Sequence, residues 1–439
     1  MLEEAAVEGT EPLLLYPTVQ SAVAALLSPG GGRRRARATM GRVSETAGDR
    51  TTRGFVRPLL ARSTDEEHRV STPLELFFDL CFVVAVAQAS NSLHHALAED
   101  DLHQVVVGYP IAFFAIWWAW MNFTWFSSAY DNDDVLYRVG VFVQIVGVLI
   151  LAAGVPRAFS GASFAIVTLG YAVMRIGLVF LWLRAARDDP PRRQTDTRYA
   201  IGISACMAGW GLLLLAPDGV HAPGIIVMVV AELLVPVWAE QSTPTSWHPH
   251  HIAERFGLFT LIVLGESVAA ATIAIQGAAD TGGSVGDLLD VAAGGMLVVF
   301  AMWWMYFAQP VGPIVERARA SLDQSSWRQA FLWGYGHYVV FASAAAVGAG
   351  LAVAADQAIG HADLSARAAT TCIAIPAALY VLSVWAVHVT AKPVGLVRAA
   401  PPCAAVLVVL VALAGLPVVA VGLVLVALVI FSELVTRAA

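Results

Sequence analysis

The sequence predicts an all-α fold, namely a polytopic integral membrane bundle of about twelve transmembrane helices. Of its 439 residues, 58% are hydrophobic and 13% are charged, whereas soluble domains carry about 25% charged residues. The mean hydropathy is +0.68. Apolar segments of roughly 20 residues recur from residue 73 onward, and a helix needs this length to cross a bilayer. Composition and segment length therefore place the chain among multi-spanning membrane proteins.

Residues 1–69 differ from the rest of the chain because they are polar and rich in glycine, alanine and arginine. Their apolar stretches are too short to span a membrane, and no signal-peptide cleavage site follows a basic start. We expect a disordered tail on the cytoplasmic side, with Met40 as an alternative start residue.

The first membrane segment opens with a helix-start signal. Pro73 suits the first helical turn, and Thr72 with Glu75 forms a capping box. Glu75 and Asp79 lie one turn apart and share a helix face. Because a charge at bilayer depth costs about 2.5–3.5 kcal/mol on insertion scales, Asp79 must face protein or water.

The remaining apolar segments extend to the end of the chain. The twelve expected spans are 73–97, 105–128, 135–155, 162–186, 198–216, 222–240, 253–276, 286–309, 329–355, 366–389, 398–415 and 417–436. Gly415-Leu-Pro417 separates the last two, and a single kinked helix is the alternative there.

Basic residues alternate between the two sides of these spans. Arginine and lysine gather in the connections 187–198, 317–328 and 392–398, whereas the loops 99–101, 216–224 and 277–287 carry none. Because basic loops stay in the cytoplasm, we expect a multi-pass plasma-membrane protein with both termini inside.

Two pairs of segments suggest a duplication. Glu75-Leu-Phe77 matches Glu254-Arg-Phe256, and Ala115-Ile-Trp-Trp118-Ala-Trp120 matches Ala301-Met-Trp303-Trp304-Met-Tyr306. Six helices separate the copies, so the halves 70–240 and 241–439 would form a parallel 6+6 repeat.

Two longer motifs carry a family resemblance. Thr72-Pro-Leu-Glu-Leu-Phe-Phe-Asp79-Leu and Glu254-Arg-Phe-Gly-Leu-Phe-Thr-Leu-Ile-Val-Leu-Gly-Glu266-Ser resemble the bacterial low temperature requirement protein A (LtrA) family. The resemblance extends from about residue 71 to the C-terminal end. It implies a multi-spanning membrane protein, but no particular substrate, reaction or cofactor.

The strongest candidates for chemistry are intramembrane carboxylates. Asp79 and Glu266 are candidate proton, ion or acid/base sites, because a buried carboxylate with a raised pKa can load and release protons. Arg255 and Glu266 lie eleven residues apart and face the same way. The alternative for Glu75, Asp79, Glu254 and Glu266 is a structural role as helix caps and ion-pair partners.

Further candidate binding residues are cationic or aromatic. Arg138 follows Asp134 by four residues, which favours a local ion pair. Arg175 needs a carboxylate from another helix, and Glu266, Asp79 or Glu232 could supply it. His337 is either a packing residue or a proton relay. Tryptophans on the matching helices, among them Trp118, Trp303 and Trp304, are interfacial or packing residues, or line a cavity for a cation or a hydrophobic ligand.

A metal site is not expected. His248, His250 and His251 with Glu254 have ligand types, but Pro249 and a loop location give them no fixed face. The sequence also contains no Walker A loop and no GxSxG motif, and we expect no nucleic-acid partner.

Three functions remain open. The first is a transporter or permease linked to protons or ions, because charged groups lie within two similar halves and no soluble catalytic domain is present. The second is a membrane-embedded enzyme that acts on a lipid or isoprenoid by acid/base catalysis. The third is a structural or sensory membrane protein.

Overall fold

The computed structural model describes residues 55–63, 70–281, 285–308, 326–388 and 395–438. Residues Arg57–Ala439 form one compact unit. Its described residues form twelve α-helices and no strand. The predicted polytopic helical bundle is therefore confirmed.

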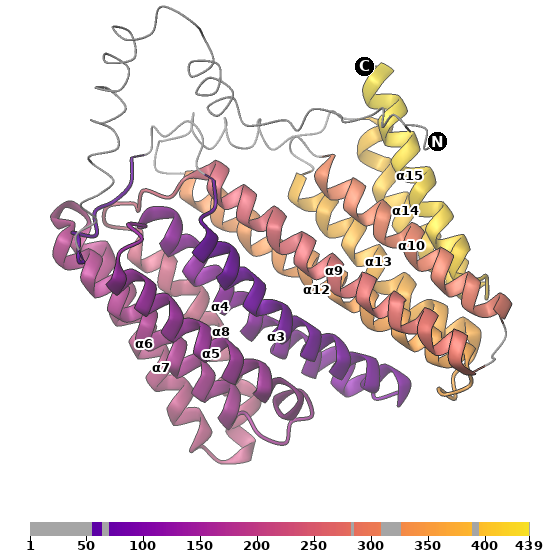
Figure 1. The fold of residues 1–439 in the computed structure, drawn as a ribbon, viewed down its shortest axis with the longest axis horizontal. Coiled ribbons are helices and arrows are strands. Elements are labelled where there is room, and N and C mark those ends of the chain that lie inside the picture. The colour runs from indigo at the N-terminus through magenta and orange to yellow at the C-terminus, as the bar shows by residue number, and fades with distance from the viewer. Residues whose placement is uncertain (1–54, 64–69, 282–284, 309–325, 389–394, 439) are drawn as a thin grey trace, which may run out of the picture. The chain divides into compact units, whose positions relative to one another are not determined.

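The twelve helices coincide with the twelve expected spans (Figure 1). The first six are α3 (Pro73–Ala98), α4 (Tyr109–Ala129), α5 (Val135–Phe159), α6 (Ala165–Asp188), α7 (Arg193–Leu214) and α8 (Asp218–Ala239). The next six are α9 (Pro249–Thr281), α10 (Val285–Phe307), α12 (Ser326–Ala358), α13 (Ala366–His388), α14 (Leu396–Leu413) and α15 (Val418–Ala438). A π-helical turn, Gln104–Gly108, leads directly into α4.

Ten of these described helices are long and apolar enough to cross a membrane. The other two are α7 and α14, the fifth helix of each set of six. The first turns of α7 hold Arg193, Asp196 and Arg198, and these polar residues make α7 a marginal span. In α14, the segment Arg398–Leu413 is a shorter apolar helix.

Local signals set the helix ends. At the start of α3, the Thr72 hydroxyl accepts a hydrogen bond from Glu75 N (3.3 Å), and the Glu75 carboxylate accepts one from Thr72 N (2.8 Å). The predicted capping box is therefore confirmed. Between α14 and α15, Gly415 has a φ of +74°, which glycine adopts without strain. The last apolar stretch is thus two helices, and the single kinked helix is wrong.

The helix contacts of the first six helices recur in the second six. In each set, the first helix packs on the second and the third, and the third, fourth, fifth and sixth pack in succession. The two sets meet where α3 and α4 contact α9 and α12. We call the side of the bundle where α3 and α9 begin the near side, and the opposite side the far side.

A segment before α3 lies against the near side. Arg62 N donates to Ala129 O (3.0 Å), Arg57 N to Asp134 (2.9 Å) and Leu59 N to Asp188 (3.0 Å). Part of the expected tail is therefore bound to the bundle, whereas residues 1–54 and 64–69 lie outside the described residues.

Candidate functional site

The first constellation lies on the near side, between α3 and α9. The Asp79 carboxylate accepts hydrogen bonds from two guanidinium nitrogens of Arg255, with Nε at 2.7 Å, and from Trp120 Nε1 on α4 at 2.7 Å. Asp79 and Arg255 are both fully buried. Because the guanidinium engages both carboxylate oxygens, this is a strong, directional ion pair.

Glu75 extends this pair into a cluster. Its Oε1 lies 3.3 Å from Arg255 Nη1 and 3.1 Å from His251 Nε2. One helix turn along α9, Glu254 accepts a hydrogen bond from Ser71 N just before α3 (3.2 Å). The residue before α3 therefore contacts a carboxylate of α9, and the first turn of α9 contacts a carboxylate of α3. We call Glu75, Asp79, His251 and Arg255 the near-side ion cluster.

The cluster has a direct mechanical consequence. Removal of one member of a buried ion pair leaves an uncompensated charge and costs about 3–5 kcal/mol. Arg255 Nη1 also donates to Ser127 Oγ on α4 (3.1 Å). The near ends of α3, α4 and α9 are therefore tied together by buried charge.

Loops reinforce the same side. Asp134 caps α5 through Tyr137 N (2.8 Å) and accepts hydrogen bonds from Arg184 on α6. Burial by itself would raise the pKa of Asp134, but the hydrogen bonds from Arg184, Arg57 N and Tyr137 N lower it to about 2. The carboxylate is thus held ionised as part of the near-side network.

The expected Asp134–Arg138 pair is not formed. Arg138 instead binds Asp133, with Nε–Oδ1 and Nη2–Oδ2 distances of 2.8 Å. Because Asp134 points toward Arg184 and the start of α5, its side chain is not directed at Arg138. The Arg138–Asp133 pair is exposed, so it is a surface contact.

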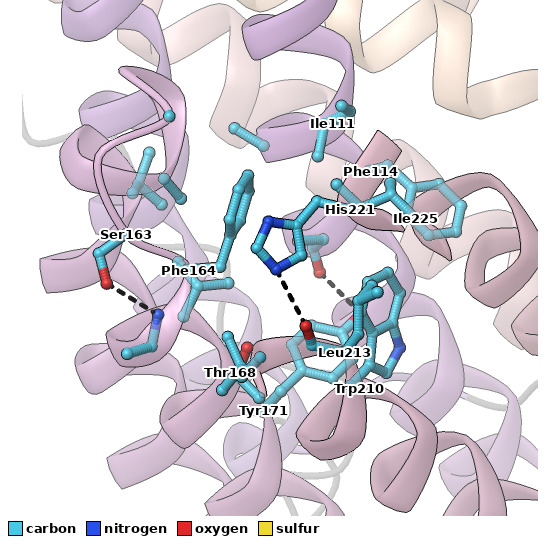
Figure 2. Close-up of a pocket in the computed structure, with 18 of the residues that line it drawn as sticks. Ile111, Phe114, Ser163, Phe164, Thr168, Tyr171, Trp210, Leu213, His221 and Ile225 are labelled. Atoms are coloured by element: carbon cyan, nitrogen blue, oxygen red, sulfur yellow. Dashed lines mark hydrogen bonds between the residues drawn. The ribbon is translucent and has the colours of Figure 1, made fainter. Parts of the chain in front are cut away.

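The second constellation is a cavity of about 330 Å³ among α4, α5, α6, α7 and α8. It reaches the far side, where the α5–α6 loop contributes Gly161 to Phe164 and the start of α8 contributes His221. Figure 2 shows Phe164, Trp210 and His221 around this space, with His221 Nε2 bonded to Leu213 O at 3.1 Å. From His221 to Glu232 the cavity follows α8 for about 16 Å.

A buried ion pair forms the inner end of the cavity. Arg175 Nη2 on α6 lies 3.0 Å from Glu232 Oε2, so the prediction that Arg175 pairs with a carboxylate of another helix is confirmed. Trp118 Nε1 donates to the same oxygen (2.9 Å), and Trp210 Nε1 donates to Glu232 Oε1 (3.3 Å). Glu232 itself lines the cavity.

The second set of helices contains a matching contact beside a much smaller pocket, of about 50 Å³, which Trp304 and Glu433 line. Trp304 Nε1 on α10 donates to Glu433 on α15 (2.9 Å), as Trp118 on α4 donates to Glu232 on α8. There, however, α10 and α15 pack closely along their length, whereas α4 and α8 do not.

Three residues explain the close packing of α10 and α15. Asp290 accepts hydrogen bonds from Val418 N (2.9 Å) and Val419 N (3.0 Å) at the start of α15. A Cβ on Gly294 would lie 2.5 Å from Val419 N, and one on Gly422 would lie 2.6 Å from Leu297 Cβ. With Glu232 aligned to Glu433, His221 occupies the position of Gly422. The larger side chain of His221 therefore lies where α8 is separated from α4.

The other predicted residues lie apart from both constellations. Glu266 is half-buried on α9, and within the described ranges it makes no hydrogen bond or ion pair. His337 Nδ1 bonds to Trp333 O (2.9 Å) and Nε2 to Tyr306 Oη (3.1 Å). Trp303 and Trp304 are 44% and 45% exposed on α10, and Trp304 contacts Glu433 on α15.

The sequence indicated Glu232 only as one of three possible partners for Arg175, and it gave no indication of this cavity. In the sequence, Ala231-Glu-Leu-Leu234 on α8 resembles Ser432-Glu-Leu-Val435 on α15. This similarity agrees with the predicted duplication and draws attention to Glu232. His221, which the sequence analysis did not single out, lies on the cavity wall.

His250 and His251 lie in the first turn of α9, and His248 directly precedes it. Among the residues that the structure describes, no group of three or more His, Cys, Asp or Glu side chains is placed to hold a metal ion. His251 lies next to Glu75 instead.

Fold and charged groups together define a polytopic helical membrane protein with a buried ion cluster and a cavity that reaches one side. Residues 70–437 match the family model of the bacterial low temperature requirement A protein (LtrA), and the chain belongs to this family. An uncharacterized protein of Rhizobium meliloti strain 1021 is 27% identical over 297 residues, which cover 63% of this chain and 68% of that protein. No solved structure matches the chain significantly.

Proposed function

We propose that this protein is a transporter of the plasma membrane, with its substrate site in the cavity that ends at Glu232. The supporting observation is the asymmetry across the membrane. The cavity reaches the far side and ends inside the bundle at Glu232 and its partner Arg175. On the near side of the bundle, the near-side ion cluster and the loop network hold the helix ends together. A carrier that exposes its site to one side at a time requires this arrangement.

The two halves support the same proposal. Residues 70–240 and 241–439 are two related six-helix units that meet at the near-side ion cluster, with parallel orientation because both α3 and α9 begin there. Because every residue that lines the cavity belongs to the half 70–240, transport would consist of a movement of α4 away from α6 and α8. This movement would break the contacts of Arg255 with Asp79, Glu75 and Ser127 and open the near side. The arginine-rich connections make the near side cytoplasmic.

In this mechanism, the charged residues have different roles. Asp79, Glu75 and Arg255 hold the near side closed, and Arg175 with Glu232 forms the inner end of the substrate site. Glu266, with no hydrogen-bonding partner among the described residues, is the candidate for coupling to a proton or cation.

Cysteine accessibility tests alternation without knowledge of the substrate. In a chain whose four native cysteines are replaced by alanine, Thr168→Cys reports the cavity and Ala129→Cys reports the buried near side. A membrane-impermeant maleimide is applied to oriented vesicles. We expect labelling of Thr168→Cys from the far side and little labelling of Ala129→Cys.

Opening the near side should reverse this pattern. Adding Asp79→Asn, which removes one charge of the cluster, should increase labelling of Ala129→Cys and decrease that of Thr168→Cys. The control is Arg138→Gln, which breaks an exposed ion pair and should change neither signal. If Ala129→Cys labelling rises while Thr168→Cys labelling stays constant, the near side has only loosened and the transporter proposal fails.

A further inference from the structure

The cavity has the chemistry to select one class of molecule. Its wall is mainly aliphatic and aromatic, with Phe114, Phe164 and Trp210 around the space (Figure 2). At about 330 Å³ it lies at the lower end of the size range of small-molecule sites. Such a wall favours a small molecule with an apolar body.

Charge at the inner end is already balanced. Arg175 and Glu232 are 4% and 1% exposed and lie 3.0 Å apart. A ligand with a full charge would therefore find no free counter-ion, and its desolvation would not be repaid. The site should exclude both anions and cations.

Glu232 nevertheless retains the capacity to bind a polar group. Its Oε2 accepts two close hydrogen bonds, whereas Oε1 accepts one long bond from Trp210. A carboxylate offers about four acceptor positions. A hydroxyl or N–H group at the inner end of a ligand can donate to Oε1.

We propose that the cavity binds an uncharged, largely apolar small molecule with one hydroxyl or N–H donor, which enters from the far side and donates to Glu232. This proposal rests on the proposed function only for the direction of entry. Binding itself is measured separately from transport, so failure of either proposal can be told from failure of the other.

The test uses three probes with one chain and different end groups: 6-bromohexan-1-ol, 6-bromohexanoate and 6-bromohexylammonium. Bromine quenches tryptophan fluorescence, and Trp210 lies on the cavity wall. We expect saturable quenching of the purified protein by the alcohol, with an affinity at least tenfold higher than for either ion. Trp210→Phe should remove most of the saturable signal.

Two variants locate the site. Ala115→Leu fills part of the cavity and should weaken binding of the alcohol at least tenfold, whereas Ala208→Leu on the exposed face of α7 should leave it unchanged. Glu232→Gln leaves Arg175 without its carboxylate and should reverse the preference, so that 6-bromohexanoate binds more tightly than the alcohol.

Other results would overturn the inference. Equal binding of an ion and the alcohol to the wild-type chain would show that charge balance does not select the ligand. Quenching that Ala115→Leu does not change would place binding outside the cavity. Displacement of the alcohol by an equimolar amount of dioleoylglycerol would identify a membrane lipid as the source, instead of a solute from the far side.

Discussion

Asp79 shows how a charged residue can be tolerated at bilayer depth. Its two carboxylate oxygens receive hydrogen bonds from Arg255 and Trp120, and the side chain is fully buried. The guanidinium supplies the opposite charge and the indole supplies a neutral donor. Hydrogen bonds to charged groups contribute about 1.5–3 kcal/mol each, so each donor is a measurable part of the near-side ion cluster.

At the residue scale, Trp120→Phe should lower the free energy of unfolding by about 1.5–3 kcal/mol, because Asp79 loses the indole donor. The matched control is Trp117→Phe on the same helix. Trp117 is also buried, but its Nε1 has no hydrogen-bond partner among the described residues. Unfolding of the purified protein in mixed micelles measures both variants, and an equal loss would contradict a special role for the Trp120 bond.

Helix pairs in this bundle depend on glycines where backbones touch. On α5 and α6, a Cβ at Gly147 would lie 2.7 Å from Gly170 O, and one at Gly170 would lie 2.4 Å from Leu151 N. The opposing atoms belong to the backbone and cannot move independently. Small residues that allow such approach are a general device for packing membrane helices.

At the element scale, Gly170→Ala should force α5 and α6 apart and destabilise the protein by about 1–3 kcal/mol. Gly211→Ala on α7 is the control, because a Cβ there meets no atom within 4 Å. The control should be neutral, or stabilising by up to about 1 kcal/mol, since alanine favours helix. Thermal unfolding in detergent tests the pair, and the prediction is wrong if both glycines tolerate alanine.

The two sets of six helices differ at the scale of the whole molecule. The indole-to-carboxylate contact is common to both, as Trp118–Glu232 and Trp304–Glu433. The helix pairs that make this contact pack differently. In the second set, α10 and α15 pack closely at Gly294 and Gly422, whereas in the first set α4 and α8 are separated near His221. The first set therefore holds a cavity of about 330 Å³, whereas the second set holds only a pocket of about 50 Å³ beside Trp304 and Glu433.

Leucine substitutions at the corresponding positions 221 and 422 should affect stability differently. Gly422→Leu places a side chain against Leu297 and the Gly294 backbone, and overpacking of this kind costs about 1–3 kcal/mol. His221→Leu enters the cavity wall, where there is space, and should cost less. The comparison uses midpoints of thermal unfolding; a larger loss for His221→Leu would contradict the assignment of the cavity to the first set.

Local sequence patterns were enough to predict the twelve helices, the start of α3 and the family, but they left the break at Gly415 open. Apolar length and the capping box at Thr72 and Glu75 are local properties, so each is visible in a few neighbouring residues. The sequence also named the residues that need partners in the bilayer, because an intramembrane charge is costly wherever it lies.

Long-range packing sets which partner each charge meets and where space remains. Asp79 and Arg255 are 176 positions apart, and no spacing rule connects them. Asp134 lies four residues before Arg138 but binds Arg184 on α6. Local spacing could not reveal this partner, because it lies on another helix. The cavity arises because α4 and α8 do not pack closely, unlike the corresponding helices α10 and α15. Such packing depends on the contact of whole helices, so a few neighbouring residues do not reveal it.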